Sequence, residues 1–198
     1  MLDEAGVTIH EGWARVVDGQ SAPVGDTELK GKRILVTTGG KAWVPEIEGR
    51  EHIRISDDLF SLEALPERVA VVGGGYIATE FASILNGLGC ETTLIYRGDL
   101  FLRGFDHDVR QFVASEMAHR GVNLEFGNNI RAIQRSEQGL SLSMQEGADL
   151  AVDEVFYATD RLPNVDGLFE GIIPDMATNG AIVVDEQFQT SIPNVYAL

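Results

Sequence analysis

Three consecutive glycines, Gly73, Gly74 and Gly75, follow the apolar run Arg68–Val72 and precede a segment with helical spacing of apolar residues. Gly73, Gly75 and Ala78 fit the G-x-G-x-x-G/A pattern, in which the first glycine permits a tight turn and the second lets the backbone approach a pyrophosphate. The small third residue lets helix and strand pack closely, and the pyrophosphate binds free N–H groups at the helix N-terminus. Because glycine turns also end ordinary strands, the pattern predicts a dinucleotide site only together with the residues that follow.

Two arginines follow the next strand, which we expect at Thr92–Tyr96. A fold that binds NAD places an acidic residue at this strand end, where it bonds the ribose 2′-hydroxyl. Here Arg97 comes directly after Tyr96, and Arg103 lies six residues further on. Since guanidinium groups pair with a 2′-phosphate and a carboxylate would repel it, the sequence favours NADPH over NADH. The alternative is that both are solvated surface charges; the strand end favours binding by Arg97, whereas spacing alone leaves Arg103 open.

The surrounding pattern predicts alternating strands and helices that position these residues. The first long helix is expected to end at Gly89 and to bury a stripe of Ile77, Phe81, Ile84, Leu85 and Leu88. A second helix is expected to begin at the cap Asp106 and to bury Val109, Phe112, Val113 and Met117. Ser56 is the expected cap of a short helix. Strands are expected near 7–10, 13–17, 34–36, 122–126, 129–135, 139–145 and 150–158.

The composition is that of a globular protein, with 44% hydrophobic and 23% charged residues among 198. No apolar run reaches the length of a membrane span and no secretion signal is visible, so we expect a cytoplasmic protein without a membrane partner. A net charge of −16 disfavours nucleic acid as a partner. The single cysteine, Cys90, argues against a disulfide framework. No metal-ligand spacing occurs among the histidines, which are His10, His52, His107 and His119.

Four stretches of the sequence resemble one protein family. The first is Gly-Gly-Gly-Tyr-Ile-Ala-Thr-Glu-Phe-Ala with the later spacing Arg-x-x-x-x-x-Arg-x-Phe-Asp, which ends at Asp106. Residues 34–40 resemble a family strand that ends in Ala-Thr-Gly, and residues 155–164 resemble a second such motif, Ala-Thr-Gly-Arg-x-Pro-Asn. Residues 183–191 resemble the segment before a flavin-binding Gly-Asp. Together they are similar to the glutathione and trypanothione reductase branch of the FAD-dependent pyridine nucleotide–disulfide oxidoreductases.

This resemblance implies an α/β fold with a Rossmann-like FAD/NAD(P)-binding domain. It divides the chain into the end of a first FAD-domain segment with a β-meander (1–46), an NADPH-binding domain (47–165) and the start of a return segment to the FAD domain (166–198). The intact parent would pass hydride from NADPH to FAD, which reduces an enzyme disulfide and then oxidised glutathione. Its partners would be the missing FAD and dimerisation domains, in a homodimer.

The resemblance also implies roles for single residues. Tyr76 would lie over the flavin, and Glu80 would lack the lysine partner that the family supplies. The residues expected at the coenzyme NADPH are Gly73, Gly74, Gly75, Tyr76, Ile77, Ala78, Glu80, Arg97, Arg103 and Asp160. Those expected on the FAD side are Ala14, Thr38, Gly39 and Arg161. The family has glycine where Asp160 stands, so this aspartate either weakens coenzyme binding or lies in a slightly shifted loop with its carboxylate in solvent.

Several family features are missing from the sequence: a second G-x-G-x-x-G motif, the redox pair Cys-x-x-x-x-Cys and the catalytic His-Glu pair. We therefore expect a central fragment of a longer enzyme, inactive alone and without a catalytic residue or metal site. Two alternatives stay open. The parent is another NADPH-dependent flavoprotein disulfide reductase, or the isolated chain is a non-catalytic dinucleotide-binding module.

Overall fold

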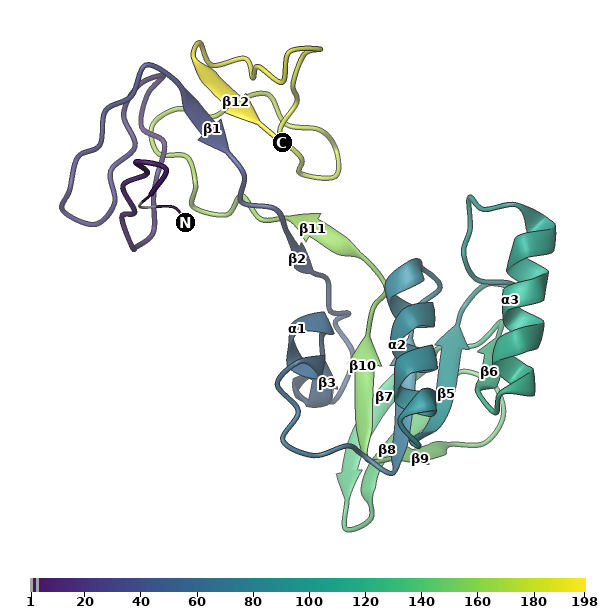
Figure 1. Cartoon of the computed structure of the whole chain (residues 1–198). Helices are drawn as coiled ribbons and strands as arrows, with labels where there is room; N and C mark the ends of the chain where they lie inside the picture. Colours follow the sequence, from purple (N-terminus) through teal and green to yellow (C-terminus); the bar gives the residue numbers. More distant parts are fainter. Residues whose placement is uncertain (1, 3) are drawn as a thin grey trace. The chain divides into compact units, whose positions relative to one another are not determined.

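The computed structural model describes residues 2 and 4–198 (Figure 1). Clustering of contacts divides the chain into two compact units. One unit is continuous, Ala42–Arg161, and the other combines Met1–Lys41 with Leu162–Leu198. These boundaries lie a few residues from the expected ones at 46/47 and 165/166, and both ends of the chain belong to the same unit.

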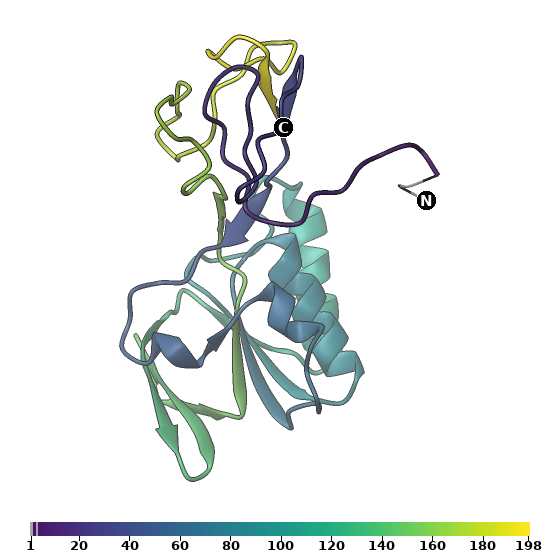
Figure 2. The ribbon, with the colours of Figure 1, turned by 90° about the vertical axis from the view of Figure 1, so that its left-hand side faces the viewer.

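The continuous unit is built on a five-stranded parallel sheet in the order β3-β10-β4-β5-β6. Two longer helices cover one face, and a three-stranded antiparallel sheet in the order β7-β8-β9 packs on the other (Figure 2). The elements of this unit are η1 (Arg50–His52), β3 (Ile53–Arg54), α1 (Ser56–Leu59), β4 (Arg68–Val72), α2 (Tyr76–Gly87), β5 (Glu91–Tyr96), α3 (His107–His119), β6 (Asn123–Phe126), β7 (Ile130–Ser136), β8 (Gly139–Met144), β9 (Leu150–Val152) and β10 (Glu154–Tyr157).

The central strand β4 is buried on both faces, which explains its unbroken apolar sequence. Val69 and Val71 point into the core beneath α2 and α3, whereas Ala70 and Val72 point into the core shared with β7–β9. From β4 the chain proceeds to β5 and β6 on one side, while β10 and β3 lie on the other. The strand order therefore reverses between β4 and β10, and ligands of such sheets bind outside the carboxyl ends of strands at this point.

Helix α2 packs on the sheet through smaller residues than expected. Phe81 and Leu85 are buried as predicted, but the buried face continues through Ala78 and Ala82. Ile84 and Leu88, which were expected in the same stripe, are about half exposed. Small residues such as these let a helix lie close to a sheet, so the buried face of α2 follows Ala78 and Ala82 rather than Ile84 and Leu88.

Asp106 caps α3 as predicted, since its Oδ1 accepts from the N–H groups of Asp108 at 2.9 Å and Val109 at 3.5 Å. The predicted stripe is wrong in part: Met117 is buried, but Val109 and Phe112 are exposed. Ser56 is also not a cap. It is the first residue of α1, and the preceding Ile55 N–H donates to Asp58 Oδ2 at 2.7 Å.

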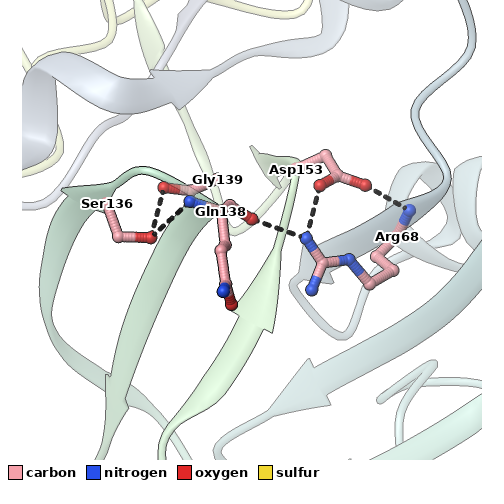
Figure 3. A network of polar contacts seen from close by, with 5 residues as sticks. All are labelled: Arg68, Ser136, Gln138, Gly139 and Asp153. Carbon is pink, nitrogen blue, oxygen red and sulfur yellow. Dashed lines mark hydrogen bonds and ion pairs between the residues drawn. The ribbon is translucent and has the colours of Figure 1, made fainter.

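The strand expected at 150–158 is divided in two at Asp153. β9 belongs to the antiparallel sheet and β10 to the parallel one, so the chain changes sheet at this residue. Asp153 accepts two hydrogen bonds from Arg68, from its N–H at 2.8 Å and from its guanidinium at 2.6 Å (Figure 3). The guanidinium also donates to the Gln138 carbonyl at 2.7 Å, in the β7–β8 turn. This network connects the start of β4 to the junction between β9 and β10 and to the β7–β8 turn.

Replacement of Asp153 by asparagine is expected to lower thermal stability at neutral pH, and the deficit should shrink in acid. The Arg68 guanidinium holds the pKa of Asp153 below its ordinary value. The stability that the ionised Asp153 contributes is fully present above the unfolded-state pKa of about 3.9. It is lost as the pH falls through the lower pKa of the folded state. Thermal unfolding followed by circular dichroism between neutral and acidic pH measures this. Asp149→Asn is the control, because within residues 2 and 4–198 the Asp149 carboxylate bonds only the Ser143 hydroxyl, at 3.4 Å; an equal deficit in both variants at every pH would contradict the assignment.

The unit formed by the chain ends has its own small core, whose buried residues are Val16, Val36, Leu168, Ile192, Val195 and Ala197. Its principal pairing is parallel, between β1 (Ile34–Val36) and β12 (Val195–Ala197). A second pair, β2 (Gly40–Ala42) and β11 (Arg161–Pro163), forms where the chain leaves and re-enters this unit. The strands expected at 7–10 and 13–17 are not formed. Ala14 and Val16 make single bridges, and Val7 and Ile9 are exposed, so alternation there reflects no buried face.

Across residues 2 and 4–198, none of the helices combines the length and the apolar character that a membrane crossing requires.

Candidate functional site

The glycine turn between β4 and α2 has two residues that the fold itself requires to be glycine. Gly73 is buried with φ +149°, and a Cβ there would lie 2.3 Å from the Ala158 carbonyl oxygen. A Cβ on Gly74 would lie 2.2 Å from Cε2 of Tyr96. Both positions are close approaches between backbone and neighbouring strands, so their glycines are explained by packing alone.

Gly75 is different, because nothing in the fold requires glycine there. Its backbone is extended (φ −94°, ψ 179°), it is exposed, and a Cβ would meet no atom within 4 Å. The open space lies at the N-terminus of the twelve-residue helix α2, where free N–H groups and the helix dipole attract an anion. The role predicted for the second glycine of the motif, the close approach of a pyrophosphate, stays a prediction.

A cavity of about 230 Å³ continues from this turn along the carboxyl ends of β4 and β10. It is lined by Ala42, Ser56, Gly75, Tyr76, Ile77, Tyr157, Ala158, Thr159, Asp160 and Arg161. The cavity is too small for a whole dinucleotide, for which pockets of roughly 300–1,000 Å³ are usual.

Five of the predicted site residues thus come together in this cavity: Gly75, Tyr76, Ile77, Asp160 and Arg161. Sequence reasoning missed the Tyr157–Thr159 wall and Ser56. The available signal was the apolar run that ends at Ala158, because the carboxyl ends of neighbouring parallel strands meet at one sheet edge. Tyr157 is buried, and burial raises its pKa.

Asp160 lies in a loop that accommodates it without strain. It is not among the non-glycine residues at positive φ, which are Leu102, Phe188 and Asn194. Its Oδ1 accepts from the Arg161 N–H at 2.8 Å, and its carbonyl accepts from the Trp43 N–H at 3.1 Å. The side chain is exposed at the cavity wall. Whether this aspartate weakens coenzyme binding stays a prediction.

Arg97 and Arg103 lie on the connection between β5 and α3, beside the glycine turn. The Leu102 N–H in this connection donates to the Gly74 carbonyl at 2.7 Å, which joins the two loops directly. Both arginine side chains are exposed, and neither forms an ion pair with a carboxylate within residues 2 and 4–198. Arg97 directly follows β5, where the sequence predicts a 2′-phosphate, and Arg103 lies six residues further along the same connection.

The remaining predicted residues are not brought to this cavity. Ala78 is fully buried between α2 and the sheet, so it serves close packing, while Glu80 is exposed on α2 outside the cavity lining. The expected FAD-side residues Ala14, Thr38 and Gly39 belong to the unit of the chain ends and are exposed there. Arg161, also expected on the FAD side, lines the cavity of the continuous unit.

Comparison with known proteins defines the class. The sequence profile of the family described as "Pyridine nucleotide-disulphide oxidoreductase" matches residues 1–198, and the chain belongs to this family. Glutathione reductase of Nostoc sp. (strain PCC 7120) is 38% identical over 212 residues, which cover all of this chain and 46% of that protein. Glutathione reductase of Burkholderia cepacia is also 38% identical, over 44% of its length. The chain thus spans about half the length of the curated relatives it matches.

Solved structures show the same fold. A Cu(II) complex of the HOCl-induced flavoprotein disulfide reductase RclA from Escherichia coli superposes with a TM-score of 0.92 at 29% identity, covering all of this chain and 46% of that one. An engineered water-forming NADPH oxidase bound to NADPH superposes at 0.86 with 25% identity, over 99% of this chain and 47% of that one. The predicted α/β Rossmann-like fold and the predicted family are therefore confirmed.

Proposed function

We propose that this chain is the NADPH-binding portion of a flavoprotein disulfide reductase, and that oxidised glutathione is the disulfide substrate of the intact parent. The observation that supports NADPH most directly is the pairing of open space at Gly75 with the unpaired guanidinium groups of Arg97 and Arg103. The choice of glutathione is supported by the glutathione reductases among the relatives. A trypanothione reductase of Trypanosoma congolense, 35% identical over 86% of this chain, keeps other disulfide substrates open.

In this proposal the residues of the chain bind and orient the coenzyme. The N–H groups at the start of α2 bind the pyrophosphate over Gly75, and the two arginines bind the 2′-phosphate. The cavity beside Tyr76 and Asp160 takes the nicotinamide end and shields it from water. NADPH supplies a hydride for a flavin. Ala14, Thr38, Gly39 and Arg161 are proposed to face FAD in the intact parent, a cytoplasmic homodimer, with Tyr76 and Glu80 close to the flavin.

The engineered NADPH oxidase gives further support for the 2′-phosphate assignment. Two of its five substitutions introduce arginines six positions apart, the spacing of Arg97 and Arg103. That protein is bound to NADPH. The same spacing on the same fold in a protein that holds NADPH supports the proposal that these side chains select the phosphorylated coenzyme here.

The second candidate function, for the chain alone, is a non-catalytic nucleotide-binding module. It is favoured by the cysteine content: the chain has one cysteine, Cys90, which is 4% exposed, so a reducible cysteine pair must come from elsewhere. Calorimetric titration of the chain with NADPH and NADH tests the shared core of both proposals, and tighter binding of NADPH is expected. Turnover of oxidised glutathione with NADPH by the chain alone would contradict the module.

Removal of the Asp160 carboxylate is expected to change NADPH affinity little. The side chain is exposed, its Oδ1 is already bonded to the Arg161 N–H, and solvent screens its charge. Titration of Asp160→Gly and Asp160→Asn with NADPH at physiological ionic strength checks this. A tenfold or larger gain, corresponding to about 1.4 kcal/mol, would instead show that the aspartate repels the coenzyme.

A further inference from the structure

The loop that bears Arg97 and Arg103 is held by buried side chains and hydrogen bonds that have no part in the proposed contacts with NADPH. Phe101, at its centre, is fully buried and meets the ring of Phe126 edge-on, at 5.5 Å between ring centroids. Leu102 is buried too, with φ +56°, a left-handed conformation that leucine rarely adopts. Because such a conformation persists only where the surroundings enforce it, the loop has one imposed shape.

A single arginine, Arg110, binds two main-chain carbonyls of this loop and so stabilises its conformation. Arg110, in the first turns of α3, donates from Nε to the Phe101 carbonyl at 2.7 Å and from its terminal nitrogen to the Leu100 carbonyl. Its side chain is half-buried and points back across the loop. The planar fork of a guanidinium can hold two neighbouring carbonyls at once, which a lysine cannot do with the same geometry.

The ring of Tyr96 supports the same loop from the glycine turn. A Cβ on Gly74 would lie 2.2 Å from its Cε2, and a Cβ on Gly98 would lie 2.8 Å from its Cε1. The ring therefore packs directly on the backbone of both glycines. With the Leu102 N–H bonded to the Gly74 carbonyl, the glycine turn and the arginine loop form one packed assembly.

We propose that Arg110 is a positioning residue for nucleotide selectivity, which holds the Arg97–Arg103 loop against the glycine turn so that both guanidinium groups meet one 2′-phosphate. This inference rests on the proposed binding of NADPH. When the loop is already ordered, binding loses less free energy to the ordering of two long side chains and their backbone. Only a nucleotide with a 2′-phosphate contacts these side chains, so only its affinity should increase.

The test compares 2′,5′-ADP with 5′-AMP, which differs from it only by lacking the 2′-phosphate, by calorimetric titration of the full 198-residue chain. Arg110→Met should weaken 2′,5′-ADP binding by about five- to tenfold, less than the loss of one charge-assisted hydrogen bond, because both phosphate-binding guanidinium groups are kept. Its affinity for 5′-AMP should stay unchanged. In the Arg97→Ala/Arg103→Ala background the Arg110 substitution should have no further effect, because the side chains that it positions are gone.

Two further variants test whether the effect comes from the position of the loop or from the loss of a positive charge. Arg131→Met also removes an arginine whose guanidinium donates to a main-chain carbonyl, that of Gln145, but on β7 away from the loop; no loss of selectivity is expected. Gly98→Ala leaves the charge unchanged and displaces the Tyr96 ring, which also packs on Gly74; it should weaken 2′,5′-ADP binding and, to a smaller extent, 5′-AMP binding. Thermal unfolding confirms that each variant is folded.

Wild-type affinity for 2′,5′-ADP in Arg110→Met would overturn the proposal, as would an undiminished effect of this substitution in the double-alanine background. If the unmutated chain binds 2′,5′-ADP and 5′-AMP equally, the NADPH assignment falls as well, and this result distinguishes the two failures.

Discussion

Replacement of Arg97 by alanine is expected to weaken NADPH binding by about one to two orders of magnitude and to leave NADH binding nearly unchanged. The 2′-phosphate is the only difference between the coenzymes, and a hydrogen bond to a charged group contributes about 1.5–3 kcal/mol. Arg97 follows β5 directly, at the carboxyl edge of the sheet beside the glycine turn. Arg103→Ala should have a smaller effect, since Arg103 lies six residues beyond the strand end and is proposed to meet the same phosphate through the loop.

The double variant should lose most selectivity, but by less than the sum of the two single effects, because both side chains pair with one phosphate. NADPH affinity of the unmutated chain should also fall as salt rises, more steeply than NADH affinity. Fluorescence or calorimetric titrations with both coenzymes measure these quantities. Equal loss of NADPH and NADH affinity in the variants would show that the arginines do not recognise the 2′-phosphate.

The glycine turn is expected to separate stability from binding. Gly73→Ala should destabilise the chain by about 3 kcal/mol or more, because the new Cβ would collide with the Ala158 carbonyl and φ is +149°. Gly75→Ala should change stability by less than about 0.5 kcal/mol, since its backbone is ordinary for alanine and the Cβ meets no atom. It should nevertheless weaken NADPH and NADH alike by about tenfold or more, since its methyl group occupies the approach of the pyrophosphate.

Urea unfolding and coenzyme titration of the same samples measure both effects. Gly87→Ala provides a control for the alanine substitution itself, because a Cβ at this helical residue also meets no atom within 4 Å and lies a full helix length from the turn. It should bind both coenzymes normally. Normal binding by Gly75→Ala would mean that the open space in front of α2 does not receive a pyrophosphate.

The elements around the glycine motif could be predicted from sequence because their signals are local. An apolar run, three glycines and a capping aspartate specify β4, the turn and the start of α3 through contacts among neighbouring residues. The buried face of α2 could not be predicted as well, since Ala78 and Ala82 differ little from surface alanines in sequence. Their burial depends on how closely the sheet approaches, which is a tertiary property.

The packing contacts that support the candidate site could not be predicted from the sequence either. Gly74 and Tyr96 are distant along the chain, and only the parallel pairing of β4 with β5 brings them into contact. The interruption at Asp153 depends on Arg68, which lies on another strand. Single bridges at Ala14 and Val16 show the converse, because an alternating pattern forms no strand where no neighbouring strand pairs with it.

The interrupted unit depends on the continuous one for its assembly. β1 must pair with β12, and the paired residues Ile34 and Val195 lie before and after the whole five-stranded sheet in the sequence. Bringing the ends of a flexible segment together costs conformational entropy, by about 0.6 kcal/mol for each doubling of its length. Once β3 and β10 pair, with Ile53 beside Val155, the residues between these two positions no longer count as flexible chain. Folding of the inserted sheet therefore lowers the loop-closure cost of the β1–β12 pairing by about 1 kcal/mol, because the flexible length becomes shorter, so mutations that loosen the insert also weaken this pairing.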